Sequence, residues 1–250
     1  MPELSGLVQS RKVAGRFWAH GDSGNPPDLY AIDRQGRLLG IYQVAGAKNV
    51  DWEDVATDDR GLLYIGDIGN NVSDRSDLCV YVVREPAHVQ KRGTLQVLRR
   101  IRFRYPDQQV GMYGLNFDAE ALFTLEGRLY LLTKHWQTDR QTTLYRFPAG
   151  EAKGEVVLER LADFDVSNEK PAIRSLVTAA DTSPDGRAVA VLTYENVFVF
   201  PVQGPTVLAK ASVRAWGPPQ RGLEALAWDG QELIVGAESG HLTHLPIPRP

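Results

Sequence analysis

Three glutamates occupy the same position of a short phrase that recurs along the chain. The phrase reads DWEDVA at 51–56, DAEALF at 118–123 and GLEALA at 222–227, and places Glu53, Glu120 and Glu224 in register. Two further copies, ELSGLV at 3–8 and LVTAAD at 176–181, carry Ser5 and Thr178 at this position. If the copies fold alike and converge, the glutamates form one acidic cluster. Clustered carboxylates bind hard cations or serve as general acids and bases.

Converging carboxylates repel one another. Two of them ~8 Å apart repel by roughly 0.5 kcal/mol in water and about 2 kcal/mol at an intermediate dielectric. We therefore expect the cluster to hold a cation, to contain at least one raised pKa, or to be offset by a basic side chain. The basic candidates are Lys134, Arg75 and Arg221.

The same glutamates supply the candidate reactive residues. Candidate catalytic residues are Glu53, Glu120 and Glu224, and candidate metal ligands are these three with Asp51; Asp54 and Asp118 lie beside them in the phrases. Oxygen ligands without clustered His or Cys favour Ca²⁺ or Mg²⁺ over zinc. The alternative is that the glutamates accept backbone N–H groups or line a wet channel.

A second set of polar residues follows the strands that come after each phrase. Turns on a rigid β-scaffold often carry binding residues, although Asp, Asn and Gly also favour turns without any ligand. The candidate ligand-binding residues are Asp22, Asp67, Lys134, His135, Tyr194 and Glu238. Oxygen donors alternate over 67–74 as in a calcium loop, but the distant bidentate Glu of an EF-hand is missing.

The elements that position these residues are short strands. Apolar or alternating runs of four to eight residues are separated by Gly, Asp, Asn and Pro, which is typical of an all-β chain. After most phrases come a turn, a second strand and a third strand. This unit repeats roughly every 45–65 residues, which is typical of propeller blades.

Five phrases predict a single β-propeller domain over 1–250 with five blades. Six blades are the alternative, and they would require a unit without a visible phrase; a sandwich has no reason to repeat one phrase. Only 27 residues run from Glu224 to Pro250, so the last blade is expected to have three strands. The basic and apolar alternation of Arg99–Tyr105 predicts an outer strand with one charged face.

Composition excludes several classes of function. The net charge of −3 gives no electrostatic drive toward nucleic acid. No apolar run approaches the ~20 residues of a membrane span. The lone Cys79 rules out an internal disulfide and lies in an apolar strand, where we expect it buried. The chain as written is expected to be soluble, and periplasmic or secreted if a leader has been removed.

The chain resembles a group of bacterial β-propeller proteins to which no activity is firmly attached. The resemblance rests on DWEDVA, on YIGDIGNN at 64–71, on DAEAL at 118–122 and on SPDGR at 183–187, in conserved order along the chain. It implies a propeller fold and export from the cell. More distantly the chain is similar to the propellers of calcium-dependent phytases, esterases and lactonases. Asn70 replaces the group's aspartate and Gly21 its asparagine, which weakens a calcium site at either loop.

These observations leave three functional hypotheses. The leading one is a propeller that binds a small molecule or a protein at an acidic channel mouth, with a divalent cation. The second is a metal-assisted hydrolase of a phosphoester, ester or lactone, in which a glutamate of raised pKa acts as base. The third is a structural scaffold for protein interaction.

Overall fold

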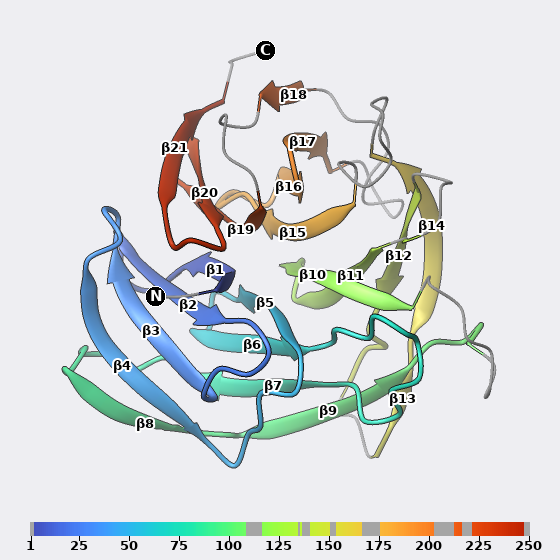
Figure 1. The fold of residues 1–250 in the computed structure, drawn as a ribbon, viewed down its shortest axis with the longest axis horizontal. Helices are drawn as coiled ribbons and strands as arrows, with labels where there is room; N and C mark the ends of the chain where they lie inside the picture. The colour runs from blue at the N-terminus through green and yellow to red at the C-terminus, as the bar shows by residue number, and fades with distance from the viewer. Residues whose placement is uncertain are drawn as a thin grey trace.

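The computed structural model describes residues 3–108, 117–134, 136, 141–150, 154–166, 176–202, 213–216 and 222–247. Within these ranges the strands form five sheets arranged as blades around a common centre (Figure 1). The protein is therefore a five-bladed β-propeller, as the five phrases predict. Within the same ranges no helix is long and apolar enough to cross a membrane.

The first two blades each receive an extra strand from the blade that follows. Blade 1 contains β1 (Leu4–Gln9), β2 (Arg16–Gly21), β3 (Asp28–Asp33) and β4 (Leu38–Ala45); blade 2 contains β5 (Trp52–Thr57), β6 (Leu62–Asp67), β7 (Cys79–Arg84) and β9 (Arg99–Arg104). Between β7 and β9 the chain forms β8 (Arg92–Gln96), which pairs in parallel with β4. Likewise β13 (Val156–Val157) pairs in parallel with β9. The outer edges of these two blades are thereby covered.

The remaining three blades complete the ring. Blade 3 contains β10 (Asp118–Leu125), β11 (Arg128–Lys134), β12 (Gln141–Arg146) and β14 (Glu159–Asp165); blade 4 contains β15 (Val177–Thr182), β16 (Ala188–Thr193), β17 (Asn196–Pro201) and β18 (Val213–Trp216). Blade 5 contains β19 (Leu223–Asp229), β20 (Glu232–Ala237) and β21 (Leu242–Pro246). Its three strands confirm the prediction for the last blade.

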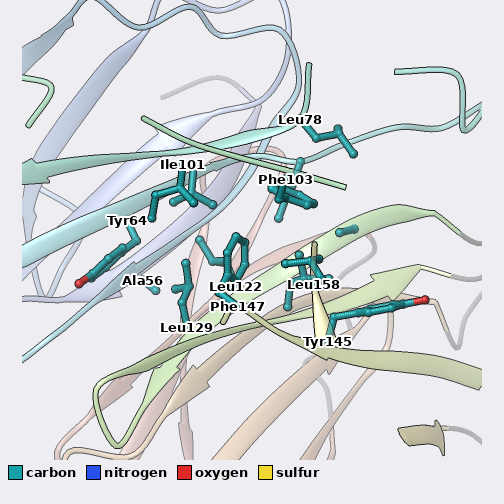
Figure 2. Close-up of a cluster of buried hydrophobic side chains, with 14 of the residues drawn as sticks. Ala56, Tyr64, Leu78, Ile101, Phe103, Leu122, Leu129, Tyr145, Phe147 and Leu158 are labelled. Carbon is teal, nitrogen blue, oxygen red and sulfur yellow. The ribbon is translucent and has the colours of Figure 1, made fainter. Parts of the chain in front are cut away.

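Apolar side chains fill the space between neighbouring blades. Between blades 2 and 3, Ile101 and Phe103 of β9 and Tyr64 of β6 meet Leu129 of β11 and Phe147 (Figure 2). The arginines of β9 alternate with these buried residues and face outward, which confirms the predicted charged face of this outer strand. Cys79 is fully buried, as expected.

The innermost strands line the centre in the order β1, β5, β10, β15 and β19, and β19 returns to contact β1 (Figure 1). Blades 1 and 5 exchange no strand among the described residues, so their seam is closed by packing and polar contacts. Leu4 and Leu7 of β1 share a buried cluster with Ala225 and Ile234 of blade 5. The Leu4 N–H donates to the carbonyl of Glu238 at 3.3 Å, and Arg34 pairs with Asp229 and Glu232 across the seam.

Candidate functional site

Every innermost strand carries an irregularity at the same position of the repeated phrase. In each hairpin of first and second strands, the register shifts across one residue of the inner strand, as in a β-bulge. The residues passed over are Ser5, Glu53, Glu120, Thr178 and Glu224. These are the five positions aligned from sequence. A bulge re-aims a side chain out of the regular pleat, so the repeat places the glutamates on one level around the centre.

One end of the channel opens into a cavity of about 290 Å³. It receives side chains from all five blades, and Glu53, Glu120 and Glu224 all line it. Four of the predicted binding residues lie here too, namely Asp22, Lys134, Tyr194 and Glu238. Two short groups of carboxylates meet at Glu53: Asp22 with Asp51 and Glu53, and Glu53 with Asp118 and Glu120, the ligand oxygens of each group lying within 4.8 Å of one another.

In the second group, the two carboxylates on blade 3, those of Asp118 and Glu120, receive hydrogen bonds from the protein itself. Lys134 Nζ lies 2.9 Å from Oε1 of Glu120, and both side chains are buried. Asp118 accepts the backbone N–H of Asn70 at 2.6 Å and the indole N–H of Trp136 at 2.7 Å. Each of these two carboxylates therefore already has hydrogen-bond donors.

The group shared by blades 1 and 2 has fewer hydrogen-bond donors, and its opposing charge is that of Arg75, which acts on Asp51. Glu53 is only 7% exposed, yet among the described residues none donates a hydrogen bond to its carboxylate or to that of Asp51. Asp22 accepts the N–H of the adjacent Ser23. Gly69 packs directly against both acids: a Cβ at this position would lie 2.2 Å from Glu53 Oε1 and 2.4 Å from Asp51 Oδ2. The glycine thus makes room for two carboxylates to approach each other.

Burial and like charge shift the titration of these acids. Burial, with Glu120 and Asp51 acting in the same direction, holds the pKa of Glu53 well above its usual range. Burial raises the pKa of Asp51 to about 6, helped by Asp22 and Asp118. On blade 5, burial raises the pKa of Glu224 to about 8 against the opposing effect of Lys134. Uncompensated carboxylates in a confined site favour protons or metal ions.

Lys134 is enclosed on three sides. Besides its contact with Glu120, its ammonium lies 4.6 Å from the ring centre of Trp136 and 5.1 Å from that of Tyr194. Burial opposes its charge, but the carboxylate of Glu120 and the Tyr194 hydroxyl outweigh burial and raise the pKa of Lys134. The ammonium is therefore a fixed positive charge that offsets Glu120. An offset by a basic side chain was one of the three outcomes expected for the cluster.

Asp67 and Arg75 pair with each other beside the cavity. Asp67 is buried beside the cavity rather than lining it, and its Oδ1 accepts from Arg75 Nη2 at 2.9 Å. Arg75 also donates to the Gly69 carbonyl at 2.7 Å and to Asp77 at 3.0 Å. Its guanidinium thus binds two oxygens of the loop that alternates oxygen donors over 67–74, together with Asp77 just beyond it, and stabilises the loop behind Glu53.

Sequence reasoning did not single out Gly69 or the Asn70 backbone, whose roles depend on the loop's path. His135 and Arg221, both named from sequence, lie outside the described residues.

No protein-family model matches the chain, and the curated proteins give no match. Solved structures match over nearly its whole length. The PQQ-bound aldose sugar dehydrogenase of Streptomyces coelicolor is 12% identical with a TM-score of 0.52, over 98% of this chain and 93% of that one. The Cps50 (Swd1) β-propeller domain of Myceliophteria thermophila is 12% identical with a TM-score of 0.51, over 99% and 97%. A gluconolactonase of Xanthomonas campestris is 13% identical with a TM-score of 0.46, over 93% and 69%. At these identities the similarity concerns the fold alone.

Proposed function

We propose that this propeller binds a divalent cation, Ca²⁺ or Mg²⁺, at its channel mouth, and that the cation helps to bind a small ligand in the cavity. The ion would be held by Asp22, Asp51 and Glu53. The observation that carries the proposal is the contrast between the two carboxylate groups. Lys134, Trp136 and the Asn70 N–H satisfy one group, whereas the buried Glu53 and the adjacent Asp51 have no donor among the described residues.

The ligand atoms determine which ions fit. All three side chains offer carboxylate oxygens, and hard cations prefer such ligands. Ca²⁺ accepts six to eight oxygens in flexible geometry, and Mg²⁺ needs six in a regular octahedron. Three protein carboxylates would leave further coordination positions for water or a ligand. An ion would also offset the burial and the repulsion that now raise the pKa of Glu53 and Asp51.

Calorimetric titration with Ca²⁺ and Mg²⁺ tests the proposal. We expect one ion per chain, and an affinity that falls at least about tenfold in Glu53→Gln, equivalent to about 1.4 kcal/mol. Glu126→Gln is the matched control, because Glu126 is an exposed acid at the opposite mouth. Equal ion affinity in wild type, Glu53→Gln and Glu126→Gln would rule out the site.

A second candidate function is metal-assisted hydrolysis, and the environment of Glu224 favours it. It lines the same cavity, and burial raises its pKa to about 8. A carboxyl group with a pKa near neutrality suits proton transfer at physiological pH. The bound cation would polarise an ester or phosphoryl oxygen. This function requires ester, lactone or phosphoester turnover that is lost with chelator and in Glu224→Gln. Ion binding without turnover would leave the binding function alone.

A further inference from the structure

The bound ion would have coordination positions facing the cavity, and the cavity wall restricts what can fill them. The wall is strongly acidic: besides Glu53 and Glu120 it contains Glu3, Glu224 and Glu238. Among its described residues, Lys134 is the one with a cationic side chain. That ammonium already contacts Glu120 and the faces of Trp136 and Tyr194.

This distribution of charge disfavours an anionic ligand. A carboxylate or phosphate would enter between like charges, and the fixed ammonium is engaged by groups of the protein. Clefts lined by one sign of charge concentrate ions of the opposite sign and repel their own. A negatively charged ligand would therefore have only the ion to attract it.

Hydroxyl groups fit the same wall well. A hydroxyl accepts through its oxygen, which can also coordinate a hard cation, and it donates its proton to a carboxylate. Glu224 and Glu238 lie on blade 5, next to blade 1 with Asp22, whereas Glu53 lies on blade 2. A compound with several hydroxyls could coordinate the ion with one edge and donate to these glutamates with another.

An aromatic surface adds a place for the carbon skeleton. Trp136 lines the cavity and is partly exposed. Its orientation is fixed by the hydrogen bond from its indole N–H to Asp118. Aromatic rings with a polar group held in place offer an apolar face beside polar contacts. The wall therefore combines hydroxyl acceptors with one flat apolar surface.

Building on the cation site proposed above, we infer that the ligand is a neutral polyhydroxyl compound whose hydroxyls coordinate the ion and donate to Glu224 and Glu238. The test uses calorimetric Ca²⁺ titration of the full chain with excess myo-inositol, cyclohexanol, acetate or inorganic phosphate, and compares affinities calculated from the free Ca²⁺ concentration. We expect myo-inositol to tighten Ca²⁺ binding about fivefold or more. Cyclohexanol, which has the same ring with one hydroxyl, should have no effect, and neither should the two anions.

Variants locate the coupling. In Glu238→Gln the tightening by myo-inositol, measured against that variant's own Ca²⁺ affinity, should be lost; Glu238 is exposed, so its substitution should not disturb folding. Glu126→Gln should keep the full effect. If wild type binds Ca²⁺ but acetate or phosphate tightens it, or no additive does, the polyhydroxyl ligand is wrong and the cation site stands. If wild type binds no Ca²⁺, the cation site fails as well.

Discussion

At the scale of single residues, the close approach of two carboxylates at the channel mouth depends on a glycine, Gly69. Gly69 allows the carboxylates of Asp51 and Glu53 to lie against the loop backbone, where a Cβ would come within 2.4 Å of both. The same loop is held by Arg75, which donates to the Gly69 carbonyl. The charge of the two acids and the room for them are thus separate features that can be altered separately.

Gly69→Ala should weaken Ca²⁺ binding without removing any charge. The added methyl overlaps Glu53 Oε1 and Asp51 Oδ2, so one or both carboxylates must move, and we expect about a tenfold lower affinity by calorimetry. Gly186→Ala is the control. That glycine has a φ of +70° and open space around its Cβ position, so its substitution should lower stability by about 1 kcal/mol and leave Ca²⁺ affinity unchanged. An unaffected affinity in Gly69→Ala would contradict the assignment of these ligands.

Ion binding should also depend on pH. Because burial raises the pKa of Asp51 to about 6, protons compete with Ca²⁺ for this ligand, and the affinity should fall as the pH decreases from about 7 to 5. In the ion-free protein the linkage has the opposite sign: protonated Asp51 stabilises the fold at low pH, and this contribution is lost as the pH rises through about 6. Titrations at several pH values check the first statement. A constant affinity over this range would contradict it.

The residue types of the site were visible in the sequence, and their partners were not. Glu53, Glu120 and Glu224 line one cavity because each occupies the same position of the repeated phrase. The neutralisation of Glu120 by Lys134 could be named only as one of three basic candidates. That Asp67 pairs with Arg75 depends on the path of a loop that no repeat specifies.

At the scale of elements, the inner strands are tied together by side chains that bond to backbone. Asp54, next to the bulge on β5, is fully buried. Its carboxylate accepts the N–H of Val55 at 2.8 Å, of Leu122 on β10 at 2.9 Å and of Ala180 on β15 at 3.3 Å. One side chain thus joins blades 2, 3 and 4 below the cavity.

Asp54→Ala should destabilise the ring. Removing the carboxylate leaves buried N–H groups of two other blades without an acceptor, which we expect to lower the free energy of unfolding by about 3 kcal/mol. Asp59→Ala, at an exposed position of the turn after β5, should change it by less than about 0.5 kcal/mol. Urea unfolding followed by tryptophan fluorescence compares the two. Equal stability of both variants would show that Asp54 does not link the blades.

Blade number and strand order followed from local patterns, because each blade is a run of neighbouring hairpins. The exchanged strands did not. β8 and β13 pair in parallel with edges formed earlier in the chain, and such non-local pairing has no phrase of its own. The five bulges were predictable in part. The repeat predicted that five positions are equivalent, and the structure shows that each of them lies at a shift in strand register.

At the scale of the whole molecule, the seam between the first and last blades closes the ring, and among the described residues it does so without an exchanged strand. Arg34 crosses it to Asp229 and Glu232, and Gln9 donates to Asp229 at 2.8 Å. The cavity spans the same seam: Ser5 lies on β1 and Asp22 directly after β2 of blade 1, and Glu224 lies on β19 of blade 5.

Arg34→Met should loosen this seam. With both ion pairs lost, hydrogen exchange should accelerate in β1 and in β19 to β21, while β10 to β12, which lie across the ring, keep their protection. Bound Ca²⁺ should slow exchange again on the blade 1 side. Uniform exchange across all blades, or none beyond wild type, would show that Arg34 does not hold the ring closed.

A crystal structure of the protein grown with Ca²⁺ and measured with calcium anomalous scattering tests the central claim most directly. The account predicts one anomalous peak at the channel mouth, at about 2.3–2.6 Å from carboxylate oxygens of Asp22, Asp51 and Glu53, with Lys134 still paired to Glu120. A mouth without a peak, or an ion held by Asp118 and Glu120 with Lys134 displaced, would contradict it.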